Sequence, residues 1–248
     1  MLLTGEVGTG KTTLCRHLLD HLQGQARTVY IVNPALTVKE LLATILDDLG
    51  VAYPTKATKK NLLDLLYRFL LETDLSQPVV IIIDDAQAMP GDSLENLRLL
   101  SNLETDKSKL LQVLLTGQPE LEELIGRPEL RQLRQRISLH CQLELLSRKE
   151  TEEYVARRLI TSGSRGSLRF STKALDLVQG YSSGVPRLIN KICDYALVAG
   201  YVANDFTIDT GHIQRAVQET GTPAYRAAGQ SGLRGLIERL RTSLFGRI

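Results

Sequence analysis

The sequence is poor in cysteine and lacks a hydrophobic run long enough to cross a membrane. Its three cysteines are odd in number, widely separated and never spaced as C-x-x-C, so neither a disulfide framework nor a zinc site is indicated. A reducing compartment fits best. No apolar run approaches the roughly 18 residues of a membrane span, and residues 1–4 are too short for a signal peptide. We therefore expect a cytoplasmic protein.

An excess of charge is also missing from most of the chain. The formal net charge is +2, but residues 221–248 alone carry +4, from five arginines and one glutamate, which leaves −2 for residues 1–220. An acidic body is not the electrostatic footprint of a nucleic-acid binder. With 43% hydrophobic and 23% charged residues over 248 positions, the composition is that of a globular protein with one large or two modest domains.

What the sequence does have is a complete phosphate-binding loop near its start. Residues 5–12 read Gly-Glu-Val-Gly-Thr-Gly-Lys-Thr, the G-x-x-x-x-G-K-[ST] pattern. Glycines let backbone N–H groups surround a phosphate, and a helix expected over residues 11–22 turns its positive end toward the same group. Lys11 would reach the β- and γ-phosphates, and the Thr12 hydroxyl would hold Mg²⁺. The predicted nucleotide-binding residues are Gly5, Glu6, Val7, Gly8, Thr9, Gly10, Lys11, Thr12 and Thr13.

Hydrophobic periodicity predicts alternating strands and helices over residues 1–146. The strongest strand is Val79–Ile83, apolar on both faces as in a fully buried parallel strand. Other strands are expected at residues 1–4, 28–32, 110–115 and 137–143. Helices are expected at 11–22, with a Leu14, Leu18 and Leu22 stripe, at 38–49 behind a Thr37/Glu40 capping box, and at 60–71. The pattern indicates an α/β fold, a five-stranded parallel sheet with covering helices.

From residue 147 the pattern changes to helices alone. Apolar residues recur at helical spacing over 148–160, 171–180, 186–199 and 209–219, so we expect a small all-helical second domain over residues 147–220. Residues 221–248 are expected to form a flexible connection and a basic amphipathic helix. Such a helix suits an anionic membrane surface or a partner's groove, and packing on its own domain is the open alternative.

Two aspartates close the strongest predicted strand. Asp84 and Asp85 would lie at the carboxyl edge of the sheet, where the phosphate loop also opens. Asp84 is expected to hold Mg²⁺, and Asp85 to orient or deprotonate the attacking water. The alternative is a solvated pair that caps the next helix. It is less favoured because five apolar β-formers precede the pair and a phosphate loop accompanies it.

At this point four segments resemble a known family. They are Asp84-Asp85-Ala86-Gln87, the T-G-Q-P-E-L of residues 116–121, the R-Q-R-I of residues 134–137 and the S-G-V-P-R-L-I-N of residues 183–190. In this order they resemble the AAA+ ATPases related to general secretion pathway protein A, including secretion ATPases of exosortase (PEP-CTERM) loci. The resemblance covers about residues 1–218. It implies a P-loop AAA+ fold whose helical domain is a lid, with ATP and Mg²⁺ as ligands.

The resemblance also implies roles for single residues. Gln118 would be the polar sensor near the γ-phosphate, with Thr116 as the second choice. Arg187 would be the sensor 2 arginine that reports nucleotide to the lid. An arginine finger that acts on a neighbouring subunit is expected among Arg131, Arg134 and Arg136, with Arg136 favoured, so a homo-oligomer is implied.

Two departures from the family pattern bear on activity. Relatives carry Asp-Glu where this chain has Asp84-Asp85, and the missing methylene withdraws the carboxylate by roughly 1.5 Å, a shift that can cost about 10²-fold in rate. Hydrolysis is therefore expected to be slow. Relatives also have a helical segment before the first strand that helps to enclose the adenine. Its absence suggests a misassigned start or a fragment.

The sequence thus predicts an ATPase that drives or switches a secretion or cell-envelope or exopolysaccharide assembly system. Its partner would be an envelope protein, and its C-terminal helix could rest on the inner face of the membrane. Two alternatives stay open. One is a DNA-linked AAA+ helper of the transposition type, which the acidic body argues against. The other is a nucleotide-dependent scaffold that does not hydrolyse, motivated by Asp85. A small-molecule phosphotransferase is disfavoured by the GVPRLIN segment.

Overall fold

The computed structural model describes residues 1–73, 77–101 and 110–221, and these fall into two compact units. We call Met1–Glu144 the sheet unit and Leu145–Ile248 the helical unit, and each is described by itself. The division lies close to the boundary expected after residue 146. The basic amphipathic helix expected within residues 221–248 falls outside the described residues.

The sheet unit is built on five parallel strands, which confirms the predicted fold class. They are β1 Leu2–Gly5, β2 Arg27–Ile31, β3 Val79–Ile83, β4 Leu111–Gly117 and β5 His140–Leu143, in the spatial order β2-β3-β4-β1-β5. The strand that leads into the phosphate loop therefore lies inside the sheet: Leu2 pairs with Leu115 on one side and His140 on the other. The last strand begins three residues later than the periodicity predicts.

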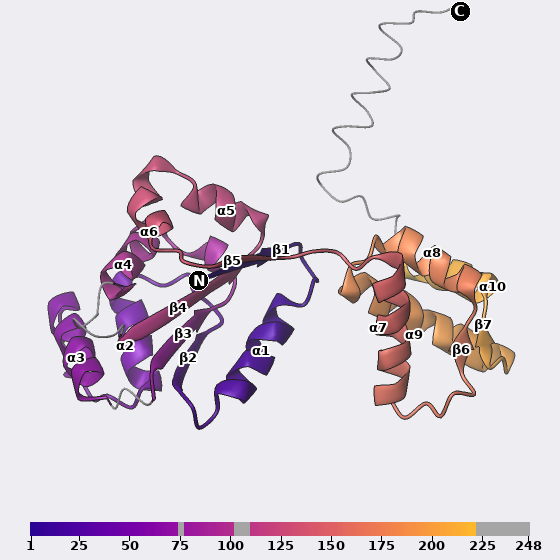
Figure 1. The fold of residues 1–248 in the computed structure, drawn as a ribbon, viewed down its shortest axis with the longest axis horizontal. Helices are drawn as coiled ribbons and strands as arrows, with labels where there is room; N and C mark the ends of the chain where they lie inside the picture. The colour runs from indigo at the N-terminus through magenta and orange to yellow at the C-terminus, as the bar shows by residue number, and fades with distance from the viewer. Residues whose placement is uncertain (74–76, 102–109, 222–248) are drawn as a thin grey trace, which may run out of the picture. The chain divides into compact units, whose positions relative to one another are not determined.

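Helices cover both faces of this sheet (Figure 1). They are α1 Lys11–Leu22, α2 Val38–Asp48, α3 Lys59–Glu72, α4 Gly91–Ser101, α5 Pro119–Ile125 and α6 Arg131–Gln135, with the short 3-10 turns η1 Ala86–Ala88 and η2 Pro128–Leu130. The capping box that starts α2 is confirmed: Thr37 Oγ1 accepts from the N–H of Glu40, and the Glu40 side chain accepts from the N–H of Thr37. Both links satisfy backbone donors at the helix start.

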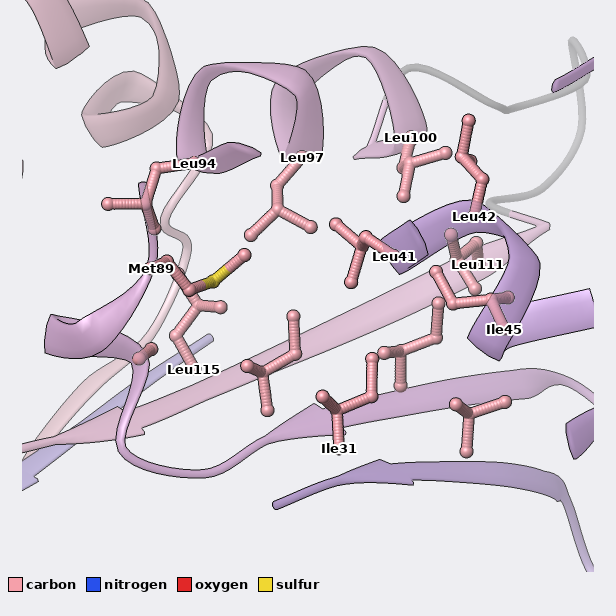
Figure 2. Close-up of a cluster of buried hydrophobic side chains, with 14 of the residues drawn as sticks. Ile31, Leu41, Leu42, Ile45, Met89, Leu94, Leu97, Leu100, Leu111 and Leu115 are labelled. Atoms are coloured by element: carbon pink, nitrogen blue, oxygen red, sulfur yellow. The ribbon is translucent and has the colours of Figure 1, made fainter. Parts of the chain in front are cut away.

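The alternation of β3 divides its side chains between two cores. Val79, Ile81 and Ile83 belong to the larger core, which α2, α3 and α4 cover, and Figure 2 shows part of it around Ile31, Leu41, Ile45, Leu97 and Leu111. Val80 and Ile82 point to the other face, where Cys15 and the leucines at 18, 19 and 22 of α1 pack. The strand is thus buried on both sides, as its unbroken apolar run predicts.

The buried face of α1 differs from the predicted leucine stripe. Leu14 is 43% exposed, whereas Cys15 is 1% exposed and contacts the sheet. A small side chain at position 15 lets the first turn of the helix lie close to β1, and the apolar contacts of the later turns come from residues 18, 19 and 22. Leu18 and Leu22 therefore pack as the predicted stripe requires, and only its first member is wrong, because Cys15 takes the place of Leu14.

The helical unit consists of α7 Arg148–Thr161, α8 Thr172–Ser182, α9 Pro186–Ala203 and α10 Thr210–Thr220. The prediction of helices alone is wrong in one detail. Two short strands, β6 Arg169–Phe170 and β7 Thr207–Ile208, pair in parallel and close the loops that precede α8 and α10. Two-residue strands carry too little periodicity to be recognised in a sequence.

Among the described residues, no helix is long and apolar enough to span a membrane.

Candidate functional site

The phosphate loop connects the buried end of β1 to the first turn of α1. Gly5 lies against β5: a side chain there would place its Cβ 2.9 Å from the carbonyl oxygen of Leu143. Gly10, with φ of 103°, precedes α1 in a left-handed conformation that suits glycine. It offers no capping side chain, so the first N–H groups of the helix are left to a ligand at its positive end.

Lys11 is folded back over its own loop. Its Nζ donates to the carbonyl oxygens of Gly5 at 2.7 Å and Glu6 at 3.0 Å, and the residue is 7% exposed. Burial lowers the pKa of Lys11 below its ordinary value, and the nearby carboxylates of Asp85 and Asp84 oppose that effect. The ammonium is thus held at the loop by two backbone carbonyl oxygens, with acidic side chains nearby.

Asp84 is the centre of a buried hydrogen-bond network. The residue is 2% exposed, and its Oδ2 accepts from Thr12 Oγ1 at 2.7 Å and from the Tyr30 hydroxyl at 3.1 Å. Its Oδ1 accepts from Thr116 Oγ1 at 2.5 Å and from the N–H of Asp85 at 3.1 Å. The two residues predicted to hold Mg²⁺, Thr12 and Asp84, are therefore in direct contact.

These hydrogen bonds decide the charge of Asp84. Burial by itself acts to raise the pKa of this carboxyl, but the donors from Thr116, Thr12 and Tyr30 outweigh it and hold the pKa below its ordinary value. The phenol responds in the opposite sense: burial and the charge of Asp84 raise the pKa of Tyr30 to about 12. Asp84 is thus kept ionised and Tyr30 neutral, which suits a carboxylate that binds a cation.

The donor set fits a magnesium ion. Mg²⁺ prefers oxygen ligands and is held in proteins by one or two carboxylates together with substrate phosphates and water. A threonine hydroxyl beside a buried ionised carboxylate supplies such oxygens next to a phosphate loop. Within the described residues, no group of three or more His, Cys, Asp and Glu side chains is placed to hold a metal ion. A site of the magnesium type does not require one.

Asp85 lies beside this network in an unusual backbone conformation. Its φ and ψ of 51° and 39° are left-handed, a region that aspartate tolerates better than most residues. The residue is exposed, and Gln87 Nε2 donates to its Oδ1 at 3.1 Å. The second predicted catalytic acid therefore faces solvent, next to the buried one.

The other predicted residues fall in three places. Thr116 contacts Asp84 directly, whereas Gln118 stands at the start of α5, and its backbone N–H donates to Gln87 Oε1. Thr13 is exposed on α1. Arg136 follows α6 and lines a cavity with Leu111 and Val113 from the amino-terminal half of β4. Since Thr116 is near the other end of β4, Arg136 is on the edge of the sheet away from the phosphate loop.

Arg187 belongs to the helical unit. It is exposed in the first turn of α9, directly after the turn formed by Ser183 and Gly184, which both have left-handed φ values. A side chain at Gly184 would place its Cβ 1.9 Å from the carbonyl oxygen of Leu146, whose N–H donates to the Gly184 carbonyl at 2.9 Å. This glycine therefore fixes how the GVPR segment packs on the start of its own unit.

Sequence reasoning missed two residues of the site. Tyr30 on β2 was assigned only to a strand, and Gln87 was used only as part of a family motif. Tyr30 is one residue before the end of β2, but its approach to Asp84 depends on β2 lying next to β3, and the sequence does not give this strand order.

A family model described as an AAA domain matches residues 1–125 of the chain. Over 234 residues the chain is 44% identical to general secretion pathway protein A of Aeromonas hydrophila. This alignment covers 94% of the chain and 43% of the relative, so the chain spans less than half of that protein's length.

Solved structures with the same fold are more distant in sequence. Cdc6p of Pyrobaculum aerophilum aligns over 98% of this chain and 79% of its own, with a TM-score of 0.67 and 16% identity. The ORC2 protein of Aeropyrum pernix, solved as ADPNP and ADP complexes, covers 99% and 69%, with a TM-score of 0.66 and 18% identity. The RuvB branch migration motor of Thermotoga maritima covers 98% and 68%, with a TM-score of 0.61 and 17% identity. At these identities the likeness shows the fold alone.

Proposed function

Because this chain belongs to the AAA+ ATPases and is similar to general secretion pathway protein A, we propose that it binds ATP with Mg²⁺ and hydrolyses it. The hydrolysis would drive or switch a secretion or envelope-assembly system. The observation that carries the chemistry is the contact of Thr12 with Asp84 at 2.7 Å beside the buried Lys11. This arrangement supports a cation site next to an ammonium group that can bind phosphate.

The binding step follows from the loop and its helix. Backbone N–H groups from Gly8 to Thr12 would receive the β-phosphate at the positive end of α1, and Thr13 would contact the α-phosphate. Lys11 would leave the carbonyl oxygens of Gly5 and Glu6 for the stronger acceptors of the β- and γ-phosphates. ADPNP and ADP in the Aeropyrum pernix ORC2 structure support an adenine nucleotide for this fold.

The hydrolytic step would be assisted by the pair of aspartates. Bound Mg²⁺ would neutralise charge on the β- and γ-phosphates, with Thr12 and Asp84 as its protein ligands. Asp85, exposed and next to Asp84, would accept a hydrogen bond from the attacking water and orient it. Thr116 holds Asp84 in its ionised form, and Gln118 would meet the γ-phosphate as the predicted sensor.

Slow hydrolysis is part of the proposal. The side chain of Asp85 is shorter than that of glutamate by one methylene, roughly 1.5 Å, and such a displacement of the carboxylate can lower the rate of hydrolysis by about 10²-fold. The left-handed backbone at this position suits Asp better than Glu. Asp85→Glu therefore tests whether side-chain length or backbone strain matters more at this position. We expect faster turnover. A slower variant would show that the length of the Asp85 side chain does not limit hydrolysis.

Two arginines outside the hydrogen-bond network of Asp84 are also proposed to have roles. Arg136, at the opposite edge of the sheet, would serve as a finger for the nucleotide of a neighbouring copy, so hydrolysis would require an oligomer. Arg187 would report nucleotide to the helical unit. Light scattering with and without Mg²⁺-ATP, followed by turnover of mixtures of Arg136→Ala and Lys11→Ala chains, tests the first role. Mixed oligomers regain activity only if the finger acts on a neighbour.

The decisive experiment for ATPase function is steady-state phosphate release with Mg²⁺-ATP. Lys11→Ala should lower turnover by about 10²- to 10³-fold, the scale of losing one preorganised donor to transition-state charge. Lys149→Ala is the matched control, because its side chain is 88% exposed in the helical unit. Equal turnover by Lys11→Ala and the unaltered chain would refute the assignment of the loop.

The role in secretion or envelope assembly rests on the relative's name and is tested in cells. Deleting the gene should block export or assembly of an envelope component, and the unaltered gene should restore it where Lys11→Ala does not. If the Lys11→Ala form also restores it, the chain acts as a scaffold without hydrolysis. A salt-dependent affinity for duplex DNA would instead favour the transposition-type helper.

A further inference from the structure

Two segments that the sequence presents separately meet through one side chain. Gln87, in η1 after the two aspartates, places its amide between Asp85 and Gln118. Its Nε2 donates to Asp85 Oδ1 at 3.1 Å, and its Oε1 accepts from the backbone N–H of Gln118 at 3.1 Å. One half-buried amide therefore links the loop after β3 to the start of α5, across 31 positions of sequence.

The chemistry of the neighbours fixes which end of the amide faces which partner. A backbone N–H can only donate, so it must meet Oε1, and an ionised carboxylate can only accept, so it must meet Nε2. A rotation of the amide by half a turn would set donor against donor and acceptor against acceptor. The two partners thus hold Gln87 in a single orientation.

Gly117 makes the space for this amide. A Cβ added at Gly117 would lie 2.6 Å from Gln87 Oε1 and 2.6 Å from Leu121 Cδ2, closer than atoms of this kind approach. Gly117 is in β4 and its φ is not left-handed, so the requirement is for room and not for conformation. The Gly-Gln pair at 117 and 118 is then explained by one contact: glycine admits the amide, and the next N–H holds it.

Asp85 needs such a support. The residue is exposed, so its side chain is less restrained by packing than that of the buried Asp84. Asp84, in contrast, is buried among three hydroxyl donors. A hydrogen bond to Oδ1 of Asp85 leaves Oδ2 to accept from a water molecule.

We propose that Gln87 is a positioning residue that holds the carboxylate of Asp85 in place and ties it to the junction of β4 and α5. The inference rests on the proposed function, in which Asp85 orients the attacking water. The two hydrogen bonds of Gln87 make the position of the Asp85 carboxylate depend on where α5 begins. A shift of α5 away from β3 would therefore free the side chain of Asp85.

The test separates turnover from binding. Gln87→Ala should lower kcat for phosphate release by about 10- to 100-fold, the scale of a misplaced catalytic group. Its dissociation constant for a fluorescent ATP analogue should stay within about twofold, because the hydrogen bonds of the Gln87 amide go to Asp85 and to the N–H of Gln118. Gln112→Ala, a glutamine exposed on the same strand as Gly117, is the matched control and should leave both quantities unchanged.

A second variant gives a pH signature that a structural role would not produce. In Gln87→Glu an ionised carboxylate would repel Asp85, while the protonated acid would again donate to it. The ratio of its kcat to that of the unaltered chain should therefore rise as pH falls from about 7.5 to about 5.5. A ratio that stays flat over this range contradicts the proposal.

Gly117→Ala tests the same contact from the other side. The added methyl should expel the amide, so this variant should reproduce the loss of kcat seen in Gln87→Ala. The double variant should lose little more than either single one, because both changes remove one interaction. Additive losses would show that Gly117 acts elsewhere.

Full turnover by Gln87→Ala would overturn the positioning role and leave the proposed ATPase function intact. Absence of turnover by the unaltered chain would instead overturn the proposed function itself.

Discussion

The sheet unit and the helical unit differ in what they bury. The buried polar residues of the described sheet unit include two charged groups, Lys11 and Asp84, together with Thr4, Ser93 and Thr116. In the described part of the helical unit they are two hydroxyl residues, Thr151 and Ser182. Buried charge is costly unless paired and hydrogen-bonded, so the two buried charged groups of the sheet unit support the proposal that the catalytic site lies there. The core of the described helical unit is apolar, and the tight turn at Gly184 packs against Leu146 at the start of the unit.

The largest expected effect is the loss of phosphate release when a buried charge of the sheet unit is removed. Asp84→Ala removes the carboxylate on which three hydroxyls converge, and we expect phosphate release to fall by about 10²- to 10³-fold. Asp176→Ala, in the helical unit, removes a carboxylate that is 58% exposed and paired with Arg148. It should leave turnover unchanged. Similar losses in both variants would mean that the catalytic contribution is not confined to the sheet unit.

The next effect concerns the stability of the helical unit alone. Gly184→Ala would force a Cβ to within 1.9 Å of a backbone oxygen at a φ of 82°, and we expect a loss of about 3 kcal/mol in the free energy of unfolding. Hydrogen exchange should place the lost protection within residues 145–221 and spare β1 and α1.

Gly180→Ala is the matched control for that variant. Gly180 is inside α8, and an added Cβ there meets nothing within 4 Å. Alanine should therefore stabilise the same unit by about 0.5–1 kcal/mol. If both glycine variants weakened the unit equally, the contact with Leu146 would not be the reason for Gly184.

Two buried cysteines, Cys15 in the sheet unit and Cys193 in the helical unit, can report the opening of each unit separately. Burial raises the pKa of Cys15 to about 11 and that of Cys193 to about 12, while Cys141 is exposed. A thiol reagent should label Cys141 at once and the buried thiols only when each unit opens. Mg²⁺-ATP at about 100 times its dissociation constant should slow Cys15 by about 100-fold, because it stabilises the sheet unit by about 2.7 kcal/mol.

Mass spectrometry of the labelled peptides measures this effect. Cys193 should slow less than Cys15, since the phosphate loop belongs to the sheet unit. Identical slowing of both thiols would show that the two units open together, so that they differ in their buried residues but not in their stability.

The smallest effect depends on pH. Tyr30→Phe removes one donor to Asp84 and should lower the free energy of unfolding by about 1–2 kcal/mol near neutral pH. The pKa of Asp84 is lowered in the folded state, so its stabilising contribution is present above the unfolded value of about 3.9 and is lost as pH falls through the folded value. Urea unfolding at decreasing pH should show the deficit of Tyr30→Phe shrinking below about pH 4. A constant deficit would mean that the hydroxyl acts through packing.

Local patterns predicted the parts of the site that depend on neighbouring residues. The apolar run of β3, the two aspartates after it, the phosphate loop and the Thr37 capping box are all legible because each is a short, contiguous signal. Parallel strands then bring the ends of β1 and β3 to one edge, so the meeting of Thr12 with Asp84 follows from topology.

Contacts between distant segments were not predictable in the same way. Nothing in the sequence near Tyr30 or Thr116 says that both hydroxyls donate to one carboxylate, because this depends on strand order and register. The choice of Cys15 over Leu14 as the buried residue of α1 depends on how closely the helix approaches the sheet. The paired strands β6 and β7 are too short to leave a pattern.

The position of β1 inside the sheet has a consequence during synthesis of the protein. Leu2 pairs with Leu115 and His140, so both neighbours of β1 leave the ribosome long after it does. At about 5–20 residues per second, the 113 positions from Leu2 to Leu115 correspond to a wait of about 6–23 s. Through that interval the strand has two unpaired edges, and the nascent chain contains a phosphate loop with no frame to hold it. The phosphate loop is therefore synthesised well before the two strands that flank β1 and support it.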